Sequence, residues 1–131
     1  MNLLLDTHVL IWSVQNSPRL GTVARNTLLN PGSRLWISAA SIWEISIKVA
    51  IGRLLLSDPL ETWIPRMRTD WNVKDLCITF DHAVAVRNLP LHHADPFDRM
   101  LVAQAQCEDL VLMTSDRWVR AYNVRTIDAS T

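Results

Sequence analysis

Cysteine is scarce in this chain, with only two residues among 131. Cys77 and Cys107 stand far apart, each inside an apolar stretch. We therefore expect buried free thiols in a reducing, cytoplasmic environment, because two distant cysteines make neither a disulfide framework nor a soft-metal site. The spacings Cys-x-x-Cys and His-x₃-His are also missing, which removes the usual sequence signals of zinc.

Long apolar runs are missing as well. No stretch approaches the roughly 20 residues that cross a bilayer, and the first residues lack the basic segment of a secretory signal. These absences predict a cytoplasmic protein without a membrane partner. Apolar residues still make up 49% of the chain, enough for a sizeable core. Since no repeat, linker or low-complexity segment interrupts it, we expect a single domain over residues 1–131.

An excess charge of either sign is also lacking, since 13 basic residues balance 13 acidic ones. Taken alone, this balance argues against a nucleic-acid partner. If bound cations neutralise four acids, however, nine acids remain against 13 basic residues, an excess of +4. Lysine is rare and most of the basic residues are arginine, the better bidentate partner of phosphate. This favours a polyanion only weakly, because arginine richness also follows the base composition of coding DNA.

Short apolar segments alternate with helical patterns along the chain. Strands are expected at 2–5, 34–37, 76–79, 110–114 and, as an edge strand, 124–127. Helices are expected from Thr7 to a stop at Pro18 and over 21–29, 39–51, 59–71, 81–87 and 96–107. This alternation predicts an α/β fold, a three-layer α/β/α sandwich with a central parallel sheet of four to five strands.

Local signals mark the helix ends. Ser38 is expected to cap the 39–51 helix and Gly52 to end it. That helix is apolar around much of its circumference and is predicted to be mostly buried. Asp58 is expected to cap the next helix, with Pro59 in its first position. Asp81 is expected to cap the 81–87 helix.

Four acids occupy equivalent places in this pattern. Asp6 directly follows an apolar strand, and Asp116 follows another. Glu44 lies in the helix that leaves the second strand, and Asp98 lies in the first turn of the helix that enters the fourth. Sites in parallel α/β sheets form beyond the carboxyl ends of the strands. Several buried carboxylates meeting there require a cation. Oxygen ligands select Mg²⁺ or Mn²⁺, and one or two such ions are suited to phosphodiester hydrolysis.

Structural interpretations of the same acids remain open. Ser41 and Glu44 have the spacing of a capping box. Asp95 and Asp98 match the N-cap and N3 positions of one helix, with Asp95 more typical of a cap than of a metal ligand. Asp116 also suits a cap for a helix starting near residue 117. Each motif alone is weak, and four at consistent topological positions are much stronger.

The histidines are weaker candidates for site residues than the four acids. His92 and His93 stand together in the loop before Asp95, where a pair can bind a soft metal or act as a general base. Adjacent loop histidines are more often simply exposed. His8 and His82 lie at expected helix starts and are interpreted as structural.

Six tryptophans are many for so small a core. Trp36 and Trp43 are predicted to lie in the interior. Trp63 and Trp71 lie on the 59–71 helix beside polar residues, so they either anchor a partner protein or pack within the molecule.

The motifs together resemble the PIN-domain ribonucleases, and more closely the VapC-type toxins of bacterial type II toxin–antitoxin systems. The segments that carry the resemblance are LLLDTH at 3–8, SAASIWEI at 38–45, GRL at 52–54, DPFDRMLVAQA at 95–105 and LMTSD at 112–116. The resemblance extends from residue 2 to about 127.

The resemblance implies a Mg²⁺- or Mn²⁺-dependent endoribonuclease that hydrolyses RNA with a metal-activated water. It also implies a homodimer and a small antitoxin that blocks the site in a toxin–antitoxin hetero-oligomer. The family's acidic quartet falls on Asp6, Glu44, Asp98 and Asp116. Its small hydroxyl residues near the metal fall on Thr7 and Thr114. Arg99 is left with two alternatives, pairing with Asp95 or contacting phosphate.

Two other functions are alternatives to a ribonuclease. A phospho-accepting receiver domain has similar length and a parallel sheet, but it needs adjacent acids after the first strand and a lysine after the last. Here Asp6 stands alone, and Lys48 and Lys74 are misplaced. A catalytically silent, antitoxin-dependent repressor subunit is the non-enzymatic alternative. The intact quartet counts against it.

Overall fold

A five-stranded parallel sheet forms the centre of the computed structural model, which describes residues 1–131. The strand order is β3-β2-β1-β4-β5, so β1 lies in the middle and β5 is an edge, as expected. All four pairings are parallel. The strands are β1 (Asn2–Leu5), β2 (Arg34–Ser38), β3 (Lys74–Leu76), β4 (Val111–Thr114) and β5 (Thr126–Asp128).

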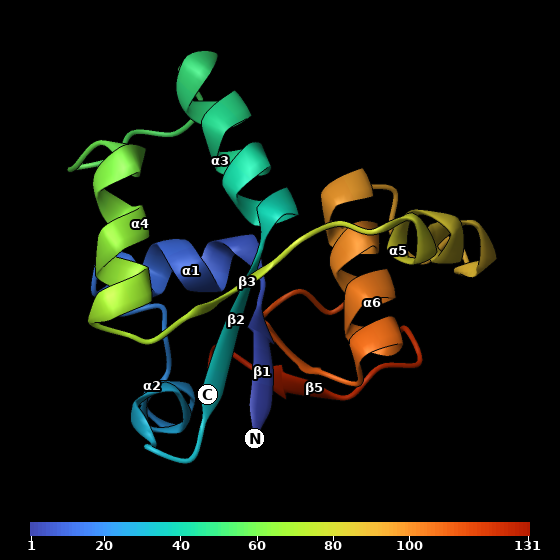
Figure 1. The fold of residues 1–131 in the computed structure, drawn as a ribbon. Coiled ribbons are helices and arrows are strands. Elements are labelled where there is room, and N and C mark those ends of the chain that lie inside the picture. The colour runs from blue at the N-terminus through green and yellow to red at the C-terminus, as the bar shows by residue number, and fades with distance from the viewer.

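Helices cover both faces of this sheet (Figure 1). Figure 1 shows α1, α2 and α4 on one side and α5 and α6 on the other, while α3 rises from the end of β2. This arrangement confirms the three-layer α/β/α sandwich. The helices are α1 (Thr7–Val14), α2 (Thr22–Leu29), α3 (Ala39–Ala50), α4 (Leu60–Thr69), α5 (Phe80–Ala85) with a 3₁₀ turn at Val86–Asn88, and α6 (Pro96–Glu108).

Two apolar clusters hold the layers together, one on each face of the sheet. Side chains alternate along a strand, so Leu3 and Leu5 of β1 point to one face and Leu4 to the other. Leu3 and Leu5 pack in the larger cluster with Trp63 of α4. Leu4 packs in the smaller cluster with Leu101 of α6. Strands buried on both faces explain why the sequence shows continuous apolar runs there.

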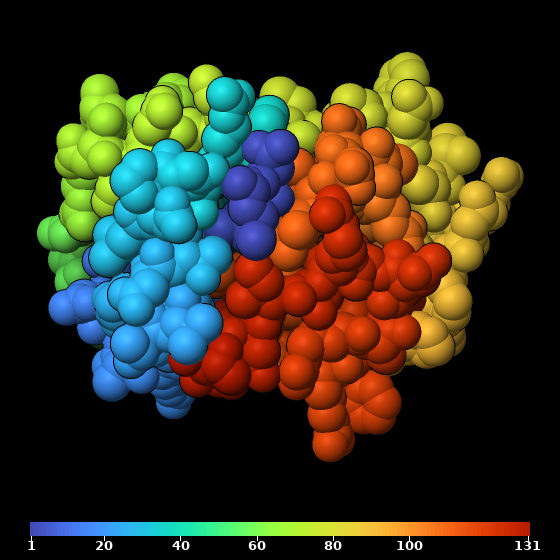
Figure 2. All heavy atoms as spheres, turned by 90° about the horizontal axis from the view of Figure 1, so that it is seen from below, coloured from blue at the N-terminus to red at the C-terminus, as the bar shows by residue number.

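The two ends of the sheet differ in character. Figure 2 views the end where β1 and β2 begin, with the first residues beside the turn that precedes β2. The terminal amino group donates to the carbonyl of Gly32 at 2.9 Å in that turn. At the opposite end, α1 and α3 start directly after β1 and β2 and place Asp6 and Ser38 at their N-caps.

Several predicted helix ends are confirmed. Ser38 caps α3 by accepting from the amide of Ala40, and Asp95 caps α6. Gly52 follows α3 with φ of 74°, a left-handed conformation that glycine adopts without penalty. The amide of Arg53 then donates to the carbonyl of Lys48 at 2.8 Å, which closes the helix.

Other boundaries were predicted wrongly. The third strand is β3 at 74–76 rather than 76–79, because Trp36 and Ser38 of β2 pair with Lys74 and Leu76. Thr79 is therefore free to cap α5, exchanging hydrogen bonds with His82, and Asp81 lies in the first turn instead of at the cap.

The ends of two more segments also differ from prediction. Pro59, not Asp58, occupies the N-cap position of α4, and no side chain caps that helix. Asp58 lies outside it and pairs with Arg66 at 3.7 Å. Residues 117–122 form turns, so Asp116 caps no helix.

Burial decides one open alternative and corrects three further predictions. Trp63 is only 1% exposed and belongs to the core, so it cannot anchor a partner. Trp43 is 59% exposed rather than interior. Only one side of α3 packs against the molecule because the helix projects beyond the sheet, so the prediction of a mostly buried helix is wrong. Cys77 and Cys107 are free but exposed, not buried.

No helix has both the length and the apolarity to cross a membrane.

Candidate active site

Asp6 enters the site from the carboxyl end of the central strand. Its amide donates to the carbonyl of Met113 on β4 at 3.1 Å, which continues the ladder by one residue. Its carboxylate accepts from the amide of Val9 at 2.9 Å, so it also caps α1. The side chain is 4% exposed. Burial raises the pKa of Asp6, and hydrogen bonds from Thr114 and Val9 oppose the rise only in part. The folded protein thus holds a carboxylate whose burial is only partly compensated by these bonds and by the charge of His8.

Glu44 lies at the same edge on α3 and is 3% exposed. The Thr7 hydroxyl donates to Glu44 Oε1 at 2.6 Å, and Lys48 Nζ contacts Oε2 at 2.6 Å. Thr7 Oγ1 also lies 3.1 Å from Ser41 Oγ. Since Ser38 is the N-cap of α3, Ser41 is not, and the capping-box interpretation of Ser41 and Glu44 is wrong.

Asp98 and Asp116 meet around His93. The Nε2 atom of His93 lies 3.1 Å from Asp98 Oδ2 and 2.9 Å from Asp116 Oδ2. One ligand atom of each of these three residues falls within 4.8 Å of the others, a grouping that could hold a metal ion. Asp98 comes from the first turn of α6, and Asp116 from the loop after β4.

The pKa of Asp98 shows how crowded this edge is. Burial, together with the negative charges of Asp95, Asp6 and Glu44, raises the pKa of Asp98 to about 7. The charge of Asp116 acts likewise on Asp6. The four acids of the expected quartet therefore lie within electrostatic range of one another, although Asp6 and Glu44 stand outside the tight group around His93.

The pKa of Asp116 is shifted in the opposite direction to that of Asp98. Burial alone raises the pKa of Asp116, but hydrogen bonds from His93 and from the amides of Trp118 and Val119 lower it below its usual value. Its own amide donates to Thr114 Oγ1 at 3.0 Å. Thr114 thus joins Asp6 to Asp116, the two acids that follow neighbouring strands.

Asp95 and Arg99 have structural partners. Asp95 Oδ1 accepts from the amides of Phe97 at 2.8 Å and Asp98 at 3.2 Å, so it is the helix cap. Arg99 does not pair with Asp95. It donates instead to the carbonyl of Pro90 at 2.9 Å, in the loop that carries His93, and to the Tyr122 hydroxyl at 3.1 Å.

His93 is the site residue that sequence reasoning undervalued. An adjacent histidine pair on a loop is usually exposed, yet the His93 side chain is only 18% exposed. The two histidines separate, because His92 packs against the ring of Tyr122 at 4.9 Å. The available signal was the position of His93, two residues before the cap of the helix that carries Asp98.

The donor set suits a hard divalent cation. It consists mainly of carboxylate oxygens, the ligands that Mg²⁺ and Mn²⁺ prefer. The raised pKa values of Asp6 and Asp98 indicate negative charges that the protein compensates only in part. A cation at this edge would relieve both the repulsion and the desolvation.

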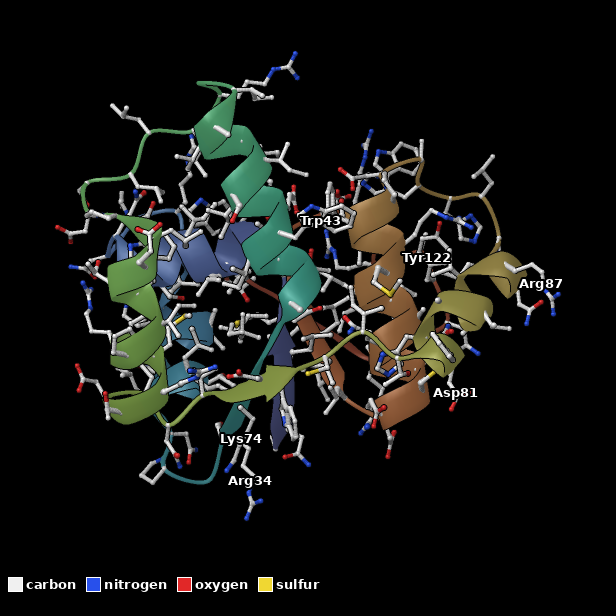
Figure 3. All side chains as sticks on the ribbon, turned by 45° about the horizontal axis from the view of Figure 1, so that its top comes forward. Arg34, Trp43, Lys74, Asp81, Arg87 and Tyr122 are labelled. Atoms are coloured by element: carbon white, nitrogen blue, oxygen red, sulfur yellow. The ribbon has the colours of Figure 1, made fainter.

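An aromatic pair borders the site. Trp43 precedes Glu44, Phe97 precedes Asp98, and their rings meet edge to face with centroids 5.1 Å apart. Figure 3 shows Trp43 between α3 and the first turn of α6. The site therefore opens beside an exposed apolar surface.

Comparisons with known proteins agree on one family. The family model of the PIN domain matches residues 3–125. The chain is 28% identical over 120 residues to "Ribonuclease VapC22" from Mycobacterium tuberculosis, covering 91% of this chain and 90% of that protein.

Solved structures show the same fold at low sequence identity. VapBC2 from Rickettsia felis, bound to a promoter DNA fragment, matches with a TM-score of 0.72, 11% identity and 98% coverage of both chains. VapBC-1 from nontypeable Haemophilus influenzae matches with a TM-score of 0.63, 21% identity and complete coverage of both chains. FitAcB from Neisseria gonorrhoeae matches with a TM-score of 0.66, 20% identity and 97% coverage of both.

Proposed function

Because this chain belongs to the PIN domain family, we propose that it is a metal-dependent endoribonuclease acting as the VapC-type toxin of a toxin–antitoxin pair. The observation that carries the proposal is the gathering of Asp6, Glu44, Asp98 and Asp116 at the carboxyl edge of the sheet. Residues 1–131 act as a single PIN-like domain, and the reaction takes place in the cytoplasm.

The chemistry assigned to the site is hydrolysis of an RNA phosphodiester. Asp6, Glu44, Asp98 and Asp116 would hold Mg²⁺ or Mn²⁺, which supplies a Lewis acid for the phosphoryl group and lowers the pKa of water. Thr7 orients Glu44, and Thr114 orients Asp6 and Asp116. No side chain at the site is placed to act as a covalent nucleophile, because the hydroxyls of Thr7 and Thr114 are both buried and hydrogen-bonded to acids or backbone.

The partner proposed for the toxin is a small antitoxin protein. Solved structures of similar fold are named as VapBC or FitAB assemblies, and three of them are bound to DNA. By the family resemblance, the second component of such an assembly is the antitoxin. In this chain, α3 exposes Trp43 and Ile47, and its C-cap residue Ile51 continues the same stripe at helical spacing. A groove of about 380 Å³ between α3 and α4, lined mostly by apolar side chains, adjoins that stripe. An antitoxin segment seated there would lie beside the acids and block RNA. A homodimer of the toxin completes the proposed assembly.

The competing functions have less support. The family match is to the PIN domain and not to a receiver domain. A receiver domain also needs a lysine in its acidic site, and the recorded ion-pair partner of Asp98 and Asp116 is His93. The silent-repressor alternative requires a degraded site, whereas all four acids are present and three of their pKa values are perturbed.

The decisive experiment is RNA cleavage by the purified chain. We expect cleavage of a structured RNA with Mg²⁺ or Mn²⁺, none with Ca²⁺ or excess EDTA, and recovery after Mn²⁺ is restored. Asp98→Asn and Asp116→Asn should abolish cleavage while retaining the circular dichroism spectrum. Asp81→Asn is the matched control, since Asp81 is an exposed acid in the first turn of α5. Equal cleavage by both site variants, or cleavage in excess EDTA, would refute the proposal.

A further inference from the structure

We propose that His93 is a positioning residue for the cation site: its Nε2–H donates to Asp116 and lies against Asp98, and His93 does not itself bind the metal. The inference rests on the proposed function, because it presumes that these acids hold Mg²⁺ or Mn²⁺. It adds a residue outside the acidic quartet and gives it a specific protonation role.

The hydrogen bonds of the ring determine its tautomer. The backbone amide of Asp95 donates to His93 Nδ1 at 3.0 Å, so Nδ1 is an acceptor and carries no proton. A ring with an unprotonated Nδ1 has its proton on Nε2. The Nε2 atom therefore faces the two carboxylates as a donor, at 2.9 Å from Asp116 Oδ2 and 3.1 Å from Asp98 Oδ2.

This tautomer is unsuited to direct metal ligation. A histidine binds a metal through a nitrogen lone pair, and the Nε2 lone pair is absent while that atom carries a proton. Moving the proton to Nδ1 would break the hydrogen bond from the Asp95 amide. Histidine could thus join Asp98 and Asp116 in the geometric grouping without being a ligand.

The Nε2–H of His93 restricts the rotation of both carboxylates. It donates to Asp116 Oδ2 at 2.9 Å and lies 3.1 Å from Asp98 Oδ2, so one oxygen of each acid is held against the ring. Asp116 Oδ1 is held by the amide of Trp118 at 2.8 Å, which fixes that side chain at both oxygens. Groups that orient metal ligands in this way are typical of metal sites, and their loss weakens metal binding about 10–100-fold.

The position of His93 is determined by residues outside the acid cluster. Its amide donates to the Tyr122 hydroxyl at 2.9 Å, and Arg99 donates to the same oxygen at 3.1 Å. Arg99 also binds the carbonyls of Val86 at 3.1 Å and Pro90 at 2.9 Å. Figure 3 places Tyr122 beside α6, close to this loop. The loop is therefore held from two directions, which makes His93 a fixed rather than an adaptable donor.

The test is Mn²⁺ binding by isothermal titration calorimetry, with no RNA present. His93→Ala should lower the Mn²⁺ affinity about 10–100-fold. His93→Gln should restore most of it, because the glutamine amide can place an N–H donor near the position of Nε2. His92→Ala is the matched control, since His92 is the exposed neighbour that packs on Tyr122, and it should bind Mn²⁺ as the parent chain does. Unchanged affinity in a folded His93→Ala variant would overturn the inference.

Pulsed electron paramagnetic resonance on the Mn²⁺-loaded protein separates a donor from a ligand. We expect no coupling from a directly bound nitrogen. A nitrogen coupling that disappears in His93→Ala would overturn the positioning role and make His93 a ligand. If Asp98→Asn also leaves Mn²⁺ binding unchanged, then the proposed metal site itself fails. A loss of binding in Asp98→Asn but not in His93→Ala rejects the further inference alone.

Discussion

Replacing Asp98 with asparagine should make the metal-free protein more stable while removing its activity. Burial and the charges of Asp95, Asp6 and Glu44 raise the pKa of Asp98 from its ordinary value of 3.8 to about 7. At about 1.36 kcal/mol per pH unit, this difference corresponds to about 4 kcal/mol of destabilisation in the ionised state. Asparagine has nearly the same shape and carries no charge, so the variant escapes this destabilisation.

Proton linkage determines in which direction Asp98 changes the free energy of unfolding and over which pH range. Below pH 3.8 the carboxyl is protonated in both the folded and unfolded chain and has no effect on stability. Between 3.8 and about 7 the unfolded chain ionises first, so the free energy of unfolding falls as the pH rises. Above about 7 both states are ionised and the loss is complete.

The expected gain in the free energy of unfolding is smaller than the about 4 kcal/mol that the pKa difference alone gives. A neutral asparagine makes a weaker polar contact than a carboxylate with His93 Nε2, which lies 3.1 Å from Asp98 Oδ2, and this difference costs about 1–2 kcal/mol. We therefore expect Asp98→Asn to raise the free energy of unfolding by about 2 kcal/mol at about pH 8. The gain at about pH 8 should exceed that at about pH 5 by about 2.5 kcal/mol, because from pH 5 to about 7 this carboxyl is ionised in the unfolded chain and still protonated in the folded protein.

Urea unfolding in EDTA, followed by tryptophan fluorescence and circular dichroism, measures this effect. Asp81→Asn serves again as the control and should change the free energy of unfolding by no more than about 0.5 kcal/mol. If Asp98→Asn is no more stable than the parent chain at about pH 8, or if its gain is the same at both pH values, the electrostatic account of this site is wrong.

Three further predictions concern pH, the His93 loop and the tryptophans. At limiting Mg²⁺, the cleavage rate should rise with pH through about 7, because binding requires the ionised form of Asp98; a flat profile of initial rates would contradict this. Arg99→Ala should lower the free energy of unfolding by about 2 kcal/mol, measured in urea, because it removes the donor to the Pro90 carbonyl and one donor to the Tyr122 hydroxyl. Trp63→Ala should cost about 3–5 kcal/mol, since its ring is buried in the core. Trp43→Ala, at an exposed position, should cost less than about 1 kcal/mol; equal losses of melting temperature in the two variants would show that the burial assignment is wrong.

Local chemistry accounts for the parts that were predictable. Apolar runs with short links indicate strands buried on both faces, and hence a parallel sheet flanked by helices. Ser38, Gly52 and Asp95 mark helix ends through bonds to residues close in sequence. The approach of the acids also follows from topology, because the carboxyl ends of parallel strands share one edge.

The predicted caps of α4 and α5 were wrong because a neighbouring residue in each segment occupies the cap position instead. Asp81 and Asp58 both have the residue type and position of helix caps, yet Thr79 caps α5 and Pro59 precedes α4. The end of β3 decides the first case, since its pairing with β2 stops at Leu76 and frees the following residues. A boundary that depends on a neighbouring strand cannot be read from its own segment.

By itself, the sequence determined the alternation of elements, the fold class and the residue types available at the carboxyl edge, because these depend on period and short-range bonding. Only the tertiary structure decided which tryptophan is buried. Trp43 lies on the more apolar helix and Trp63 on one with polar neighbours, yet Trp63 is the one that other elements cover. It also decided the environment of His93, whose contacts with Asp116 and Tyr122 span more than 20 residues. Contacts at such separation depend on how the layers meet, and no local pattern of residues specifies that.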